Sequence, residues 1–226
     1  MIFKIITLGL MATFYVCYFV KMISQRKHGI STDQLGKGKT GFVKVIEMTL
    51  KLSTYVLPII QLISILWYIG TAHIALRIIG CAITAAGVLA FIMSVAQMKD
   101  NWRAGVQRED KTELVTTGIY SISRKPAFLG FDLMYIGILF TFFNWYLCFA
   151  TSFVLVFFHL QIVNVEEEFL IEAFGEEYVQ YKKKVCRYHG RRTFFVLNYP
   201  LVHLPDFFWF CVYSLFKIVQ QTNPVS

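Results

Sequence analysis

Five long apolar segments, separated by short turns or by polar stretches, dominate the pattern of this chain. They cover residues 2–23, 46–68, 74–98, 127–143 and 145–163. A helix needs about 20 residues to cross the hydrocarbon core of a bilayer. The pattern therefore predicts an all-α integral membrane protein with about five transmembrane helices. The fourth segment is a little short, so we expect it to begin below the bilayer surface.

Composition supports a membrane protein and excludes several other classes. Hydrophobic residues make up 56% of the chain and charged residues 16%, whereas soluble domains are about 45–50% apolar and about one quarter charged. The formal charge of +8 lies in loops beside apolar segments, which indicates anionic membrane lipids rather than nucleic acid as its partner. The five cysteines are scattered without a CxxC pair, so we expect neither a disulfide framework nor a metal site.

The distribution of charge predicts an orientation in the membrane. The loop 21–44, the connector 99–125 and the part after residue 163 are basic or heavily charged, whereas the turns at 70–73 and at Asn144 are not. Basic loops stay on the cytoplasmic side of a membrane. Five spans place all three charged parts on that side and the N-terminus outside, in either a bacterial inner membrane or the endoplasmic reticulum.

The stretch Leu114–Gly130, LVTTGIYSISRKPAFLG, carries the most distinctive polar pattern. Pro126 follows the basic pair Arg124 and Lys125 and precedes the fourth apolar segment. Proline suits the first turn of a helix and pushes the residue before it away from helical geometry. The stretch therefore predicts a helix that enters the membrane at Pro126, with two cations at headgroup depth. Such cations can bind an anionic ligand or simply anchor the helix.

A charged segment, residues 166–192, follows the last span and has its own helical pattern. Its apolar residues recur at three- and four-residue steps, at Leu170, Phe174, Tyr178, Tyr181 and Val185. Gly175 is expected to interrupt this helix. Acidic residues dominate its beginning and basic residues its end, which complements the helix dipole. We expect the segment to fold back over the last two spans as a cytoplasmic cap.

These patterns divide the chain into three parts. Residues 1–98 hold the first three spans, and residues 99–192 hold the connector, the hairpin of the last two spans and the cap. Residues 193–226 form an aromatic tail, within which Phe207–Val219 is too short to span comfortably and is interpreted as an interfacial helix.

Two blocks, LVTTGIYSISRKPAFLG and EEEFLIEAFGEEYVQYKKKV, occur in this order with the hairpin between them. Together they resemble the isoprenylcysteine carboxyl methyltransferase family, which is related to the membrane phospholipid methyltransferases. The resemblance covers roughly residues 107–187. It implies S-adenosylmethionine as methyl donor, bound between the last two spans and the cap. It also implies that a lipidic acceptor, such as a prenylated thioether that carries a carboxylate, enters from the bilayer.

The resemblance also implies site residues, by matching position. The implied cofactor contacts are Gln107, Glu113, Leu114, Val115, Tyr120, Lys125, Pro126, Ala127, Phe128, Glu166 and Glu167. The implied catalytic pair is Arg124 and Glu167, with positioning roles. An ionised carboxylate acceptor needs no strong base, so catalysis would depend mainly on proximity and orientation.

The residue types suit this cofactor. Arg124 or Lys125 can pair with its carboxylate, and arginine offers a bidentate contact. Glu166 or Glu167 can accept hydrogen bonds from its ammonium group or its ribose. The rings of Tyr120 and Phe128 offer faces to the adenine or, through a cation–π contact, to the sulfonium.

Three positions depart from the family pattern. Lys125 stands where the family has histidine, and Phe128 where it has tyrosine. Ile162 stands where eukaryotic members have an arginine on the substrate side. Alternatives therefore stay open: a phospholipid N-methyltransferase, which would need a base such as His159, a sterol-type reductase that uses NADPH, or a non-catalytic membrane protein.

Asp132, inside the fourth span, is a further candidate. Acids within membranes are often functional, but Asp132 could equally pair with Arg124 or Lys125.

Overall fold

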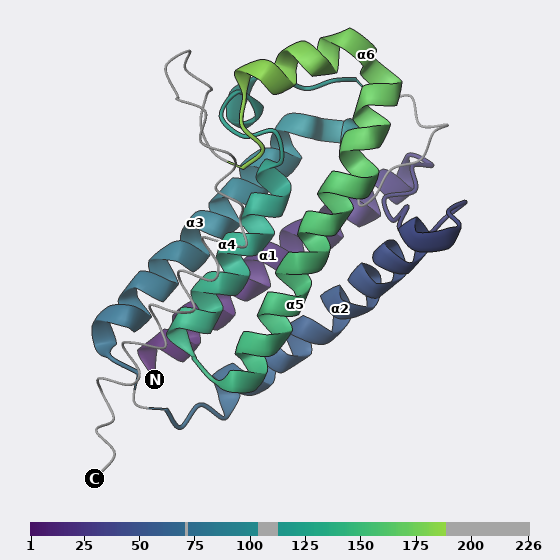
Figure 1. Ribbon diagram of the computed structural model, residues 1–226. Coiled ribbons are helices and arrows are strands. Elements are labelled where there is room, and N and C mark those ends of the chain that lie inside the picture. The colour runs from purple at the N-terminus through teal and green to yellow at the C-terminus, as the bar shows by residue number, and fades with distance from the viewer. Residues whose placement is uncertain (71, 104–112, 189–226) are drawn as a thin grey trace. The chain divides into compact units, whose positions relative to one another are not determined.

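The computed structural model describes residues 1–70, 72–103 and 113–188, and no β-strand occurs among these residues. This part of the chain forms six α-helices: α1 (Ile2–Lys27), α2 (Gly41–Leu66), α3 (Ile74–Met98), α4 (Pro126–Thr141), α5 (Trp145–Gln161) and α6 (Glu167–Lys184). Their arrangement can be followed in Figure 1. Three short helical turns, η1 (Lys99–Asn101), η2 (Gly118–Ser121) and η3 (Ile162–Glu166), lie between them. The predicted interfacial helix in the tail 193–226 and the predicted site residue Gln107 lie outside the described residues.

Four helical stretches are long and apolar enough to cross a membrane: Ile2–Lys27, Gly41–Leu66, Ile74–Asn101 and Trp145–Lys184. In the last of these, which has 40 residues, the apolar part is α5. The fifth apolar helix, α4, has 16 residues, so it is about 24 Å long and shorter than the ~30 Å hydrocarbon core. The prediction of an all-α integral membrane protein with about five apolar helices is thus confirmed.

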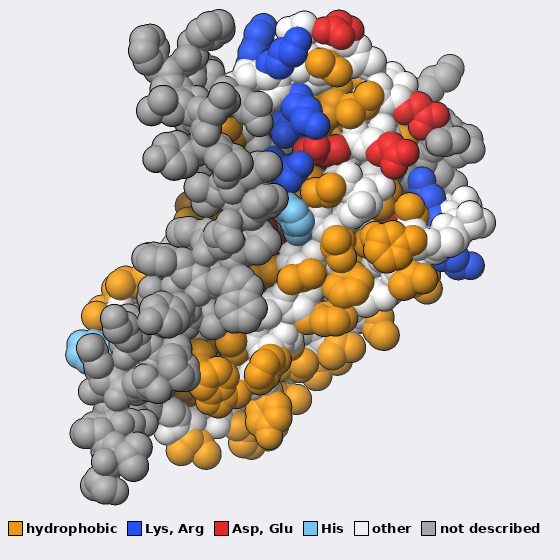
Figure 2. All heavy atoms as spheres, in the orientation of Figure 1, with side chains coloured by type: hydrophobic (Ala, Val, Ile, Leu, Met, Phe, Trp, Pro, Cys, Tyr) orange, Lys and Arg blue, Asp and Glu red, His pale blue; other side chains and the backbone are white. Residues whose placement is uncertain are grey.

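The surface of the described residues divides along the helix axes. Figure 2 shows hydrophobic side chains gathered over α5 and its neighbours, whereas charged side chains gather at the end that α6 forms. Large apolar residues such as Phe149 and Val156 on α5 are exposed. Exposed apolar surface of this extent is stable in lipid and not in water. The α6 end is therefore the boundary between the membrane and water.

Helices α3 and α4 form the most extensive helix contact of the described part. Gly87 of α3 lies directly against Gly130 of α4: a Cβ atom at Gly87 would be 2.7 Å from the Gly130 carbonyl oxygen, and one at Gly130 would be 2.9 Å from the Gly87 carbonyl oxygen. Gly80 and Gly137 make a second close approach further along the pair. Small residues allow membrane helices to pack this closely.

The polypeptide passes from α5 into α6 through the wide helical turn η3 without a loop. Helix α6 bends at Gly175, whose φ of 52° and ψ of −128° are not helical, so the predicted interruption is confirmed. Beyond α6 the chain returns to the start of α4. There the amide groups of Arg124 and Lys125 donate to the carbonyl oxygens of Cys186 and Arg187, each at 3.1 Å.

The loop between α1 and α2 is held against the bundle by buried polar groups. The fully buried Glu47 of α2 accepts hydrogen bonds from the Gly36 amide (2.7 Å) and from Nε2 of Gln161 on α5 (3.1 Å). The fully buried Gln25 of α1 donates to the Trp102 carbonyl oxygen at 2.7 Å. The loop is therefore a fixed part of the α6 end.

The glycine contact between α3 and α4 can be tested by adding one methyl group. Gly87→Ala should lower the stability by about 1–3 kcal/mol, because the two backbones must separate. Gly9→Ala on α1 is the matched control, since a Cβ there would meet nothing within 4 Å. The measurement is the thermal unfolding midpoint of the detergent-purified protein, and equal midpoints for the two variants would contradict the contact.

Candidate ligand site at the membrane boundary

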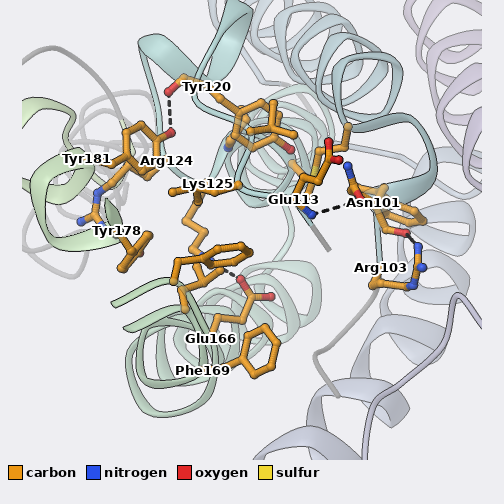
Figure 3. A pocket seen from close by; sticks show the side chains of 18 of the residues that line it. Asn101, Arg103, Glu113, Tyr120, Arg124, Lys125, Glu166, Phe169, Tyr178 and Tyr181 are labelled. Atoms are coloured by element: carbon orange, nitrogen blue, oxygen red, sulfur yellow. Dashed lines mark hydrogen bonds and ion pairs between the residues drawn. The ribbon is translucent and has the colours of Figure 1, made fainter. Parts of the chain in front are cut away.

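A cavity lies where the connector, the start of α4 and the beginning of α6 meet (Figure 3). Ten residues implied by the resemblance line it: Glu113, Leu114, Val115, Tyr120, Arg124, Lys125, Pro126, Ala127, Phe128 and Glu166. Glu167 is not among its lining residues. The two separated sequence blocks therefore come together around one space.

Local backbone geometry places the first block. Gly118 has a φ of 59°, a left-handed conformation that glycine adopts at little cost, and it begins the turn η2 that carries Tyr120. The Tyr120 hydroxyl lies 2.7 Å from Oγ of Ser94 on α3. Pro126 then begins α4, as the sequence predicted. Tyr120 and Lys125 are thus held at opposite ends of a short stretch fixed to α3 and α4.

Arg124 connects this stretch to the cap. Its guanidinium group is 5% exposed, and Nε donates to the Val185 carbonyl oxygen at 3.0 Å. Nη1 donates to the Tyr178 hydroxyl at 2.7 Å and lies 3.2 Å from Oε1 of Glu167. A buried cation is stable only with such partners. Arg124 therefore fixes the position of α6 over the cavity.

Glu167 lies at the centre of a cluster of cations. Besides Arg124, Nε of Arg187 donates to it at 2.8 Å and Nζ of Lys182 at 3.0 Å. Burial acts to raise the pKa of Glu167, but the two hydrogen bonds and the charge of Arg124 outweigh burial and lower this pKa to about 2. The carboxylate is therefore ionised, and its implied contact with a cofactor stays a prediction.

Lys125 and Glu166 form a second ion pair, and both side chains line the cavity. Figure 3 shows the Lys125 side chain extending to the Glu166 carboxylate. Both residues are buried. The cavity wall thus carries one cation and one anion that balance each other, which suits a ligand that also carries both charges.

Several lining residues belong to the inner face of the cap and were not implied as contacts. Phe169, Leu170, Phe174, Tyr178 and Tyr181 line the cavity. The helical apolar stripe in the sequence could have pointed to these lining residues, but its spacing indicates helix packing rather than a cavity. The Tyr181 hydroxyl donates to the Tyr120 carbonyl oxygen at 2.5 Å. Burial raises the pKa of Tyr181, so this hydroxyl keeps its proton at neutral pH.

A second cavity, of about 350 Å³, lies among α1, α2, α4 and α5 and adjoins the first. Five residues line both cavities: Trp102, Arg103, Ala127, Phe128 and Glu166. The walls of the second cavity are mainly aromatic, with Tyr15, Phe131, Tyr135 and Phe158 among them. A boundary cavity with a charge pair thus adjoins a larger, apolar cavity within the helices.

Three other candidates from the sequence lie away from both cavities. The Oδ1 atom of Asp132 is buried without a hydrogen-bond partner among the described residues. Because Arg124 and Lys125 pair with Glu167 and Glu166, the alternative in which Asp132 pairs with one of these cations is wrong. His159 lies 3.3 Å from the Tyr188 hydroxyl. Neither His159 nor the fully buried Ile162 lines a cavity.

Known proteins match the part of the chain that holds this candidate site. A family model described as phospholipid methyltransferase matches residues 75–177. The chain is 42% identical over 79 residues to protein-S-isoprenylcysteine O-methyltransferase of Saccharomyces cerevisiae. These aligned residues are 35% of this chain and 33% of the yeast protein. The Schizosaccharomyces pombe protein of the same name is 39% identical over 72 residues, 32% of this chain and 30% of that protein.

A plant relative extends the match at lower identity. Protein-S-isoprenylcysteine O-methyltransferase B of Arabidopsis thaliana is 26% identical over 119 residues, which are 53% of this chain and 58% of that protein. The chain therefore spans about a third of the length of the two yeast relatives and somewhat more than half of the plant relative.

The fold and the two adjoining cavities describe an integral membrane protein with a candidate ligand site at the membrane boundary. Residues 75–177 of the chain match the family model described as phospholipid methyltransferase. The resemblance to isoprenylcysteine carboxyl methyltransferases, predicted from the two sequence blocks, is confirmed by the matches to proteins of that name.

The cation cluster around Glu167 predicts a pH dependence of stability. The folded-state pKa of about 2 lies below the ordinary value of 4.5, so the stabilisation is present above about pH 4.5 and is lost as the pH falls toward 2. The full effect is about 3 kcal/mol. Wild type should lose thermal stability on acidification through this window, and Glu167→Gln should lose less.

Glu168→Gln is the matched control, because Glu168 is the exposed neighbour of Glu167. The unfolding midpoint of the detergent-purified protein is measured from about pH 6 to pH 3, where the protonation of Glu167 begins. An acid response of Glu167→Gln equal to that of the control would contradict the role of the cluster.

Proposed function

We propose that this protein is an S-adenosylmethionine-dependent membrane methyltransferase whose acceptor is the carboxylate of a prenylated or otherwise lipidic thioether. The observation that carries the proposal is the shared wall of the two cavities. Ala127, Phe128 and Glu166 face a charged space at the water boundary on one side and an apolar space among the spanning helices on the other. The names of the relatives indicate the same chemistry in those proteins.

The boundary cavity has the groups that this cofactor requires. The ammonium and carboxylate of its amino acid part can take the places of the two partners in the Lys125–Glu166 pair. Tyr120 and Phe128 supply ring faces along the same wall, suited to the adenine or to the positively charged sulfur. When bound, S-adenosylmethionine supplies an electrophilic methyl group. Phe128 lies in both linings, so it would contact both the cofactor and the acceptor.

The apolar cavity suits a lipid chain. Rings from α1, α4 and α5 line it, and burial of a hydrocarbon chain against them contributes roughly 0.8 kcal/mol per methylene group. An acceptor held there would present its carboxylate to the methyl group that S-adenosylmethionine would supply. An ionised carboxylate has no proton to lose, so proximity and orientation would supply the catalysis.

The state of Glu166 favours a carboxylate acceptor over an amine. A protonated phospholipid amine must lose a proton before it can be methylated, and Glu166 is the carboxylate of the shared wall that could accept it. The Glu166 carboxylate is already engaged in an ion pair with Lys125. His159 lines neither cavity. An ionised carboxylate acceptor has no proton to lose, so it needs neither Glu166 nor His159 as a base.

We place the α6 end, and with it the site, on the cytoplasmic side of a bacterial inner membrane or of the endoplasmic reticulum. The basic loop between α1 and α2 and the basic end of α6 support this orientation, since positive charge is retained on that side. The N-terminus then lies outside, and the acceptor would be a cytoplasmic product anchored in the facing leaflet.

The class of cofactor can be tested by thermal stabilisation. S-adenosylhomocysteine should raise the unfolding midpoint of the detergent-purified protein, because a ligand that binds only the folded state stabilises it. NADPH should leave the midpoint unchanged. Stabilisation by NADPH alone would indicate a reductase, and no response to either nucleotide would contradict an enzyme of this class.

The role of the cap in cofactor binding can be tested with two substitutions. Arg124→Ala and Glu167→Ala should each weaken binding of S-adenosylhomocysteine by roughly tenfold or more, because either change removes the buried ion pair that holds the beginning of α6 against the start of α4. Binding is measured by calorimetry on protein that remains folded in membranes. Glu168→Ala is the control, and unchanged affinity in both test variants would remove Arg124 and Glu167 from the site.

A further inference from the structure

Lys51 of α2 and Asp33 of the loop between α1 and α2 form an ion pair in the lining of the apolar cavity. Nζ of Lys51 lies 2.5 Å from Oδ2 of Asp33, and the two side chains are 30% and 33% exposed. Neither residue lies in the part of the chain that matches the family model. This pair adds to the charges of Arg103 and Glu166 in a cavity whose other lining residues are mostly apolar or aromatic.

The charge lies at one end of the cavity. Lys51, Tyr55 and Pro58 of α2 line it together, and their spacing of four and three residues places them on one helix face. Pro58 is about 10 Å further along the axis than Lys51, toward the middle of the bundle. The cavity therefore has a polar end near the water boundary and an apolar end within the helices, which is the shape of a lipid with an anionic head group.

Asp33 is held in place by the backbone as well as by Lys51. Its Oδ1 atom accepts a hydrogen bond from the Leu35 amide at 3.2 Å. The loop is fixed independently through Gly36 and the buried Glu47. Asp33 can therefore release Lys51 without loss of the loop structure, and its partial exposure lets water replace the lysine.

The rest of the lining leaves Lys51 as the group that can meet an incoming anion. Among the described residues, the cations that line this cavity are Lys51 and Arg103. Arg103 donates to the carbonyl oxygens of Asp100 and Trp102 and thereby holds the shared wall. Ile162, at the position that an arginine occupies in eukaryotic members of the family, does not line the cavity.

We propose that Lys51 binds the carboxylate of the lipidic acceptor, and that Asp33 occupies Lys51 until this carboxylate displaces it. The inference rests on the proposed function and adds the residue that recognises the acceptor. One oxygen of the acceptor carboxylate pairs with Lys51, and the other stays available for the methyl group at the wall formed by Phe128.

The exchange also explains release of the product. Asp33 is held to Lys51 by a partly exposed ion pair, and such pairs are weak, so the acceptor carboxylate can displace Asp33. Methylation removes the negative charge of the acceptor. Asp33 then pairs with Lys51 again, and the neutral ester loses its polar contact.

The test uses N-acetyl-S-farnesylcysteine as acceptor, with S-adenosylmethionine, and the purified full-length protein. Lys51→Met should raise the acceptor KM by roughly tenfold or more, because it removes a charged hydrogen-bond donor. Asp33→Asn should lower this KM, because the competing anion is gone. Lys44→Met, an exposed lysine on the same helix, is the matched control and should leave the KM unchanged.

The double variant Lys51→Met/Asp33→Asn separates recognition from damage to the loop. Its KM should equal that of Lys51→Met, since Asp33 competes only where Lys51 is present. As a second readout, inhibition by the methyl ester of the acceptor should be the same for Lys51→Met and wild type.

Two results would overturn the inference. One is methyl transfer to farnesylcysteine with a KM that Lys51→Met does not change, and this result leaves the proposed function in place. The other is methyl transfer to phosphatidylethanolamine vesicles and not to farnesylcysteine, which would keep the cofactor of the proposed function and overturn its carboxylate acceptor. Failure of the proposed function looks different, because S-adenosylhomocysteine would then not stabilise the wild-type protein before any acceptor is added.

Discussion

The buried ion pair between Arg124 and Glu167 is the interaction on which the arrangement of the site depends. It joins the start of a spanning helix to the first turn of the cap, 43 positions later in the chain. Taking two charges out of water is costly unless they are paired, and Arg124 is the partner of Glu167 that lies at the start of α4. The start of α4 and the cap therefore fold as one unit, and the boundary cavity is the space that their aromatic side chains leave between them.

Adjacent glutamates have different roles because a helix turns by about 100° per residue. Glu166 points into the cavity and meets Lys125, whereas Glu167 points away from it toward Arg124, Lys182 and Arg187. The Lys125–Glu166 pair is placed to exchange its partners with a ligand. Glu167 already has three cationic partners and keeps the walls of the cavity in position. A charged site that must bind a zwitterion without collapsing needs both kinds of pair.

Local chemistry made much of this structure predictable. Hydropathy located the spans, Pro126 marked the start of α4, and Gly175 marked the bend in α6. The directions in which the Glu166 and Glu167 side chains point were not predictable. The turn η3 joins α5 to α6 and sets where each side chain lies around the helix axis. The loop between α1 and α2 is held by Glu47 of α2, which also binds Gln161 of α5, 114 positions away, and no local pattern encodes a contact at that distance.

The close glycine contact between α3 and α4 also sets the depth of the site. Helix α3 continues for eleven residues beyond Gly87, to Met98, whereas α4 has only four residues before Gly130. The two helices run antiparallel, so the entrance of α4 is recessed by about 10 Å below the end of α3. A reaction at this level occurs beneath the plane of the membrane surface, and a lipid-anchored molecule can reach it without being lifted out of its leaflet.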